Sequence, residues 1–122
     1  LGRRGAEMLS PECARLRGAS GWSGLMAVAG ATYPGEARQL REAMPEALFL
    51  VPGFGAQGAS AKEALAGFVP GPRGLEGGVV SSSRAVLYPQ TAAEARTMAD
   101  WRAAIAEAMA AAAAELRAAC TS

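Results

Sequence analysis

The stretch LFLVPGFGAQG, residues 48–58, places a short apolar run directly before a loop with three glycines. An apolar run of this length predicts a buried strand, and the small residues after it let backbone N–H groups approach an anion closely. A second junction of the same kind is GGVVSSSR, residues 77–84, where an apolar run ends in serines and Arg84. Arginine can bind a phosphate through two charge-assisted hydrogen bonds. The two junctions together predict a phosphate site.

Strands and helices are expected to alternate on both sides of the glycine loop. The signals are apolar runs and helix caps; Ser60 with Glu63, and Thr91 with Glu94, fit capping boxes. They predict strands at residues 25–29, 48–51 and 77–80, a loop at 69–74, and helices at 11–17, 34–44, 60–68 and 91–119. Wholly apolar strands between helices indicate a parallel sheet that is covered on both faces.

Two of the predicted helices depend on particular residues. Ser10 and Pro11 fit an N-cap and a first helical residue, so the first helix is expected to begin at Pro11. The last helix carries an apolar stripe at helical spacing, which predicts packing against the rest of the domain. The stripe consists of Met98, Trp101, Ile105, Met109 and Leu116.

The number of strands suggests a partial domain. Three strands are few for a parallel domain, and the sequence starts with Leu1 rather than Met. We therefore expect residues 1–122 to be one partial domain, the C-terminal portion of a longer protein. (β/α)₈ barrels often bind phosphate with the loops after strands seven and eight. The predicted fold class is α/β, with about three βα units from the C-terminal part of a (β/α)₈ TIM barrel.

Composition argues against several classes of function. A net charge of +1, from 12 basic and 11 acidic residues, gives no electrostatic reason to expect nucleic acid or an anionic membrane as partner. No apolar run reaches the roughly 18 residues of a membrane span, and the start LGRR does not resemble a secretory signal. Without histidine, the chain has no Ser–His or Cys–His nucleophile and no His metal site. We interpret Cys13 and Cys120 as free thiols in a reducing cytosol.

The glycine loop has other interpretations. Residues 53–58 fit the dinucleotide pattern G-x-G-x-x-G, but the acidic residue that should end the next strand is missing, since Glu76 precedes that strand. A Walker-type loop fails because Ala59 and Ser60 stand where Lys and Ser or Thr are needed. The glycines could also merely build a tight turn. The serines at 81–83 lack a base and are better interpreted as donors to an anion.

Three motifs in this order and spacing resemble orotidine 5′-phosphate decarboxylase, most closely the bacterial branch often called type 2. They are VAGATYP at 28–34, FLVPGFGAQG at 49–58 and SSSR at 81–84, and the resemblance spans roughly residues 20–90. It implies a (β/α)₈ barrel, usually dimeric, that converts orotidine 5′-monophosphate to UMP and CO₂ with no metal or cofactor. We expect a cytoplasmic protein, in line with the interpretation of the cysteines as free thiols. This chain would supply strands six, seven and eight.

The resemblance also assigns roles to individual residues. Gln57 matches the glutamine that reaches over the nucleotide to its phosphate, and Arg84 matches the arginine that holds the phosphate, with the Ser83 backbone N–H beside it. Pro52 would line the pocket near the reacting carbon of the base. The loop with Gly53, Gly55 and Gly58 would close over the ligand. The chain departs from the family pattern at Ser81, Ala85 and Phe54, where asparagine, glycine and tyrosine are common.

The family's catalytic group has no match in this chain. That group is an Asp-x-Lys-x-x-Asp motif plus a further lysine on earlier strands, whereas this chain has one lysine, Lys62, and one aspartate, Asp100, both on predicted helices. No catalytic residue is therefore expected here, and the chain alone should be inactive. Two alternatives remain: another barrel enzyme acting on a sugar phosphate, and a non-catalytic nucleotide-binding protein.

Overall fold

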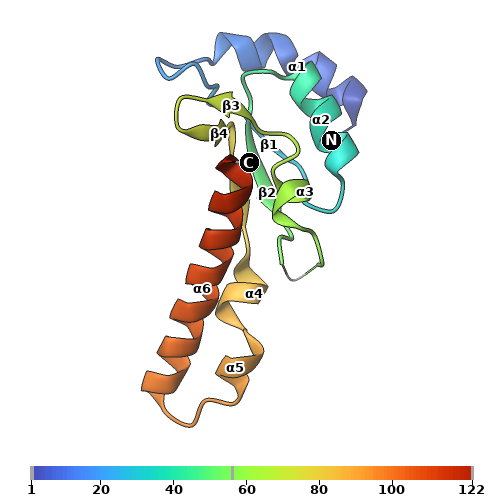
Figure 1. Ribbon diagram of the computed structural model, residues 1–122. Coiled ribbons are helices and arrows are strands. Elements are labelled where there is room, and N and C mark those ends of the chain that lie inside the picture. Colours follow the sequence, from blue (N-terminus) through green and yellow to red (C-terminus); the bar gives the residue numbers. More distant parts are fainter. Residues whose placement is uncertain (1, 56, 122) are drawn as a thin grey trace.

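A three-stranded parallel sheet forms the centre of the computed structural model, which describes residues 2–55 and 57–121 (Figure 1). Its strands are β1 (Met26–Val28), β2 (Leu48–Pro52) and β5 (Gly78–Ser81), in the order β1-β2-β5. The register pairs Val28 with Leu50, and Leu50 with Val79. All three strands lie where the sequence predicts them, because each is a short apolar run between turn-forming residues.

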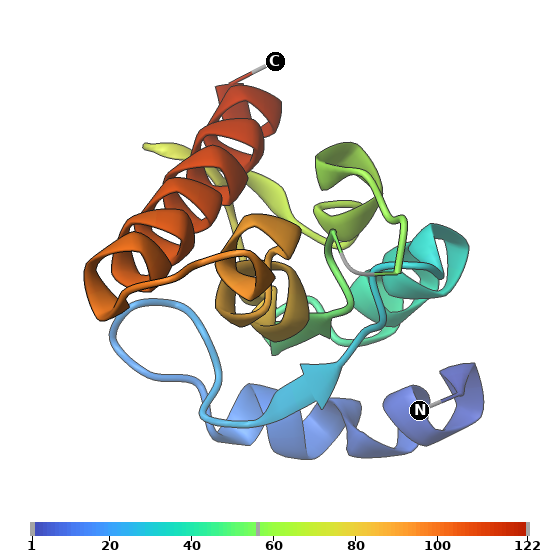
Figure 2. The same cartoon turned by 90° about the horizontal axis from the view of Figure 1, so that it is seen from below.

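Six helices and one hairpin accompany the sheet in the described residues. The helices are α1 (Arg3–Arg15), α2 (Pro34–Ala43), α3 (Ala61–Ala64), α4 (Ser83–Leu87), α5 (Gln90–Ala93) and α6 (Met98–Thr121). Strands β3 (Val69–Gly71) and β4 (Gly74–Glu76) pair antiparallel. Seen from below, α1 lies along one side of the molecule and α6 along the other (Figure 2). None of the described helices combines the length and apolar character needed to cross a membrane.

The core lies on one face of the sheet. Phe49 and Val51 of β2 are buried there together with Leu40 and Met44, which come from α2 and its C-terminal end. The apolar spacing of α2 predicts this packing, and its start at Pro34 is confirmed. The two cysteines are unpaired, as predicted.

The opposite face of the sheet is apolar but uncovered. Val28, Leu50 and Val79, which are neighbours across the three strands, are 59%, 37% and 59% exposed. The expectation that both faces are covered is therefore wrong for the described residues. In a (β/α)₈ barrel the face away from the helices points into the barrel, where side chains from the other strands fill it. An uncovered apolar inner face is what three strands of such a barrel would present.

Helix α1 begins eight residues earlier than predicted, and Pro11 lies inside it. Proline removes one helical hydrogen bond, to the carbonyl four residues before it. That carbonyl belongs to the exposed residue Glu7, where water can satisfy it. Ala6 and Cys13 are fully buried on the packed side of the helix, and their burial outweighs the local signal at Ser10.

Other boundaries also differ from the prediction. Residues 69–76 form the β3–β4 hairpin rather than a loop, and Phe68 lies outside the four-residue helix α3. The predicted helix at 91–119 is interrupted: α5 is a separate turn, and α6 starts at Met98. The hydroxyl of Thr97, not Thr91, accepts the capping hydrogen bond, from the backbone N–H of Asp100 at 3.1 Å.

The prediction that the apolar stripe of α6 packs against the rest of the domain is only partly correct. Met98, Trp101 and Met109 are 63%, 42% and 59% exposed, so they are not part of the buried core of the described domain. Leu116, near the end of the helix, does pack against the core. Figure 1 shows why: most of α6 extends away from the sheet, with α4 and α5 beside it. The helix also contacts α3 and β4.

Arg41 stabilises the amino-terminal edge of the sheet by hydrogen bonds to the segments that precede its strands. Its guanidinium is buried and donates hydrogen bonds to five backbone carbonyls: Gly67 (2.7 Å), Met44 (3.3 Å), Pro45 (3.0 Å), Ala47 (2.7 Å) and Gly77 (2.9 Å). It also lies over the rings of Phe49 and Trp22, 4.0 and 5.2 Å from their centres. Burial lowers the pKa of Arg41, although an arginine stays charged. The segments that precede β2, β3 and β5 are thereby tied to the end of α2.

Candidate functional site

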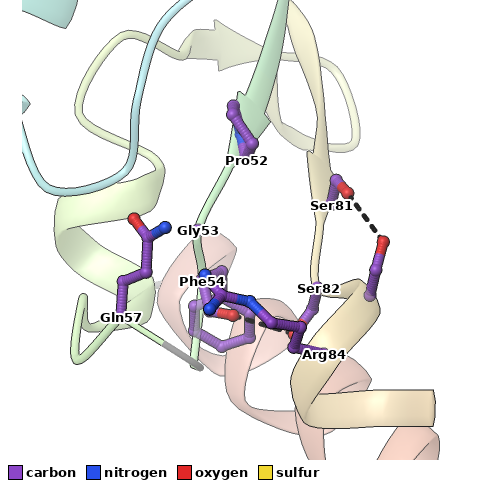
Figure 3. Close-up of a pocket in the computed structure, with 8 residues that line it drawn as sticks. Pro52, Gly53, Phe54, Gln57, Ser81, Ser82 and Arg84 are labelled. Atoms are coloured by element: carbon purple, nitrogen blue, oxygen red, sulfur yellow. Dashed lines mark hydrogen bonds between the residues drawn. The ribbon is translucent and has the colours of Figure 1, made fainter. Parts of the chain in front are cut away.

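The two predicted junctions meet at the carboxyl-terminal edge of the sheet. Pro52 ends β2 and pairs with Ser81, which ends β5, so the loops that follow these strands start side by side. Together they line one pocket, shown in Figure 3. Its lining residues are Pro52, Gly53, Phe54, Gln57, Ser81, Ser82, Ser83 and Arg84.

The glycine loop needs its glycines for conformation. Gly53, Gly55 and Gly58 have φ of +95°, +78° and +79°, a region that other residues rarely adopt. A Cβ on Gly53 would lie 2.7 Å from Oε1 of Gln57. Glycine at 53 therefore lets the Gln57 side chain turn back over the loop and into the pocket.

The serine junction supplies the other side of the pocket. Ser83 and Arg84 are the first two residues of α4, and the hydroxyls of Ser81 and Ser83 are 3.5 Å apart. The Ser82 hydroxyl is used differently, since it donates a 2.9 Å hydrogen bond to the backbone carbonyl of Phe54. That bond joins the two loops (Figure 3). The expectation that the serine hydroxyls all serve an anion is therefore wrong for Ser82.

Arg84 and Gln57 project toward the pocket from opposite loops (Figure 3). Both side chains are exposed, and neither makes a hydrogen bond or ion pair with any residue that the structure describes. A guanidinium offers only donors, and the Gln57 amide and the hydroxyls of Ser81 and Ser83 can also donate. None of the described lining residues is acidic. The pocket is therefore suited to an anion with several acceptor oxygens, such as a phosphate.

Five of the predicted site residues line this pocket: Gln57, Arg84, Ser83, Pro52 and Gly53. Gly55 and Gly58 lie in the same loop without lining the pocket, and the Gly58 N–H donates to the Gly55 carbonyl at 3.1 Å. Lys62 and Asp100 lie on α3 and α6, away from it. Within residues 2–55 and 57–121, no cluster of three or more His, Cys, Asp or Glu side chains is placed to hold a metal.

Sequence reasoning missed the lining role of Phe54 and the loop-to-loop bond of Ser82. Phe54 is only 2% exposed and anchors its loop from within, although it follows a glycine in an obvious turn. A serine hydroxyl after a strand is more often expected to bond to nearby backbone. Its partner, the Phe54 carbonyl, is 28 positions away and carries no side-chain signal.

Comparisons with known proteins point to one family. No family model matches the chain. It is 43% identical over 82 residues to the orotidine 5′-phosphate decarboxylase of Rhodopirellula baltica, covering 67% of this chain and 26% of the relative. It is 39% identical over 90 residues to that of Clostridium novyi, covering 70% and 30%. An aligned stretch covering 70% of the chain must include its middle, so both loops of the pocket lie inside it.

A solved structure supports the same relationship. A Toxoplasma gondii protein described as an orotidine-monophosphate-decarboxylase matches 94% of this chain and 42% of its own chain, with a TM-score of 0.58 and 25% identity. The chain spans about a quarter to a third of the length of the curated relatives it matches. In sequence and in fold the chain is therefore similar to a part of the orotidine 5′-phosphate decarboxylases.

Proposed function

We propose that this chain is the phosphate-binding, C-terminal portion of an orotidine 5′-phosphate decarboxylase, the enzyme that makes UMP for pyrimidine biosynthesis. One observation carries the proposal. Gln57 and Arg84 reach one pocket from the loops after two adjacent parallel strands, and no acidic side chain lines it. The phosphate of orotidine 5′-monophosphate would bind there, with the Ser83 N–H beside Arg84 and with Pro52 toward the pyrimidine base.

The uncovered sheet face supports the partial-barrel proposal. Val28, Leu50 and Val79 form an apolar row across the strands. In a complete barrel, such rows pack against the inward side chains of the other strands. The complete protein would then be a (β/α)₈ barrel, which we expect to be a cytoplasmic homodimer like the family as a whole.

The chemistry would come from elsewhere in the barrel. In the family's reaction the C6 carboxylate leaves as CO₂, its electron pair stays on C6, and a lysine protonates that carbon. None of the eight residues lining the pocket is a lysine or a carboxylate that could take part. Binding energy from a remote phosphate can instead hold the reacting carbon against catalytic groups. This chain would thus contribute positioning rather than proton transfer.

The test uses the complete polypeptide that contains this chain. We expect it to convert orotidine 5′-monophosphate to UMP, and we expect UMP to compete while ribose 5-phosphate does not. Equal competition by the pentose phosphate would favour an enzyme acting on a sugar phosphate. Tight UMP binding without turnover would favour a nucleotide-binding protein. Either of these results would overturn the decarboxylase proposal.

A further inference from the structure

Ser82 lies where the two loops of the pocket touch. It follows β5, and its hydroxyl donates to the Phe54 carbonyl in the loop after β2 at 2.9 Å. Ser82 is half-buried and Phe54 is 2% exposed, so this contact is partly shielded from water. Of the side-chain hydrogen bonds among the described residues, this is the one that connects the glycine loop to the serine junction.

A second contact at the same place shows that the loops are close. A Cβ on Gly55 would lie 3.1 Å from the Ala85 Cβ and 3.5 Å from the Ser82 hydroxyl oxygen. The two loops are therefore in close contact at Phe54 and at the adjacent Gly55. This approach requires a glycine at 55 for space, in addition to its positive φ of +78°.

The contact fixes the relative position of the two ligand-facing side chains. Arg84 follows Ser82 by two residues, and Gln57 follows Phe54 by three. A loop with three glycines has much conformational freedom of its own. Binding is stronger when the donors are already held in their bound positions, because less freedom is lost on binding.

We propose that Ser82 is a positioning residue that sets the spacing between Gln57 and Arg84 so that both reach one phosphate group. This inference rests on the proposed function. Ser82 itself does not need to touch the ligand. Its hydroxyl is already donated to the Phe54 carbonyl, so it acts through the loop that carries Gln57.

The experiment compares UMP with uridine, which lacks the phosphate, as ligands of the complete enzyme. Loss of one neutral hydrogen bond that orders the site corresponds to about three- to tenfold in affinity. We expect Ser82→Ala to weaken UMP binding and raise KM by that factor, while uridine affinity stays unchanged. Ser82→Thr keeps a hydroxyl and should restore UMP binding. Ser20→Ala, which removes an exposed hydroxyl before β1, should change neither affinity.

Two results would overturn the inference: unchanged UMP affinity in Ser82→Ala, or equal weakening of UMP and uridine, which would indicate a general structural defect. Thermal unfolding of each variant confirms that the protein is folded at the assay temperature. Arg84→Ala separates the two proposals. If it weakens UMP binding and Ser82→Ala does not, only the role of Ser82 fails. If Arg84→Ala leaves UMP affinity unchanged, the phosphate site itself fails.

A double variant tests whether the effect of Ser82 depends on Arg84. If Ser82 acts by placing Gln57 and Arg84 together, removing Arg84 should remove most of its effect. Ser82→Ala should then weaken UMP binding by less than twofold in an Arg84→Ala background, because residues in one network are not additive. A full, independent effect in that background would contradict the proposed coupling.

Discussion

The two edges of the sheet use arginine in opposite ways. At the amino-terminal edge, Arg41 is 8% exposed and donates to five backbone carbonyls. At the carboxyl-terminal edge, Arg84 is exposed and its guanidinium bonds to no described residue. The N–H donors of Arg41 are hydrogen-bonded to the backbone, whereas those of Arg84 remain available for a ligand. This division matches (β/α)₈ barrels, where one end serves stability and the other binds substrates.

Burial explains why Arg41 needs so many partners. Taking a guanidinium out of water is costly unless its N–H groups are all hydrogen-bonded. Arg41 bonds through Nε, Nη1 and Nη2, and its flat faces lie against Phe49 and Trp22. It also bonds to the carbonyl of Met44, the C-cap of α2, at an end where a helix leaves carbonyls without helical partners. Donors that are bonded to backbone carbonyls in this way are not available to a ligand.

The largest effect is expected from Arg41→Ala. Several buried carbonyls would lose their donor at once, and hydrogen bonds to a charged group contribute about 1.5–3 kcal/mol each, not additively. We expect the complete protein to lose at least about 3 kcal/mol of unfolding free energy, measured by urea denaturation. Arg38→Ala, on the exposed side of the same helix, should change it by less than about 0.5 kcal/mol. Equal effects would show that Arg41 does not fasten this edge.

Arg84→Ala tests the opposite edge. Loss of a charge-assisted contact with phosphate is expected to cost about 1.5–3 kcal/mol, or about 10- to 150-fold in UMP affinity and in kcat/KM. The unfolding free energy should hardly change, because the guanidinium has no partner within the described part of the fold. Arg84→Lys should be intermediate, since it keeps the charge without the bidentate geometry. Unchanged kinetics in Arg84→Ala would refute the assignment.

Gly77→Ala tests the same edge of the sheet at one of the residues whose carbonyl accepts a hydrogen bond from Arg41. Gly77 has a φ of +110°, and an added Cβ would lie 2.8 Å from Nη2 of Arg41 and 2.9 Å from the Trp22 ring. We expect a loss of about 1–3 kcal/mol in unfolding free energy, with UMP affinity retained. Gly35→Ala is the matched control, because Gly35 lies in α2 with no atom near the added methyl. An unchanged unfolding free energy in Gly77→Ala would mean that the residues around Arg41 can rearrange to accommodate the methyl group.

The smallest effect concerns the cap of α3, which follows the glycine loop. The backbone N–H and the hydroxyl of Ser60 each donate to the Glu63 carboxylate at 2.8 Å, and these bonds lower the pKa of Glu63. The Glu63 carboxyl is therefore more acidic in the folded state than in the unfolded chain, where the pKa of a glutamate is about 4.3. Its contribution to stability is present above that pKa and is lost as the pH falls through the folded value.

Glu63→Gln isolates this contribution. Glutamine can keep the capping bonds but does not titrate. The difference in melting temperature between the wild-type protein and Glu63→Gln should therefore be larger near neutral pH and shrink as the solution becomes acidic. A difference that stays constant through the acid range would show that the cap does not depend on the charge of Glu63.

Local sequence signals located the strands, α2, the Ser60–Glu63 cap and the glycine loop, because each depends on neighbouring residues. They misplaced α1, where burial of Ala6 and Cys13 overrides the signal at Pro11. They gave no indication of Arg41. Its acceptors are backbone carbonyls as many as 36 positions away, and a carbonyl is the same in every residue.

The candidate site shows the same division. Loop composition and family resemblance pointed to Gln57 and Arg84, which the structure brings to one pocket. The bond from Ser82 to the Phe54 carbonyl could not be predicted, because it depends on how two loops approach each other. Contacts between distant loops appear only once the strands are placed in register.

The apolar row of Val28, Leu50 and Val79 has a consequence for handling the protein in water. A flat sheet surface of this kind, with strand edges open beside it, favours contact with any similar surface. We therefore expect the separate chain to self-associate, to an extent that increases with its concentration. A preparation that stays dispersed would itself be evidence that something covers the row.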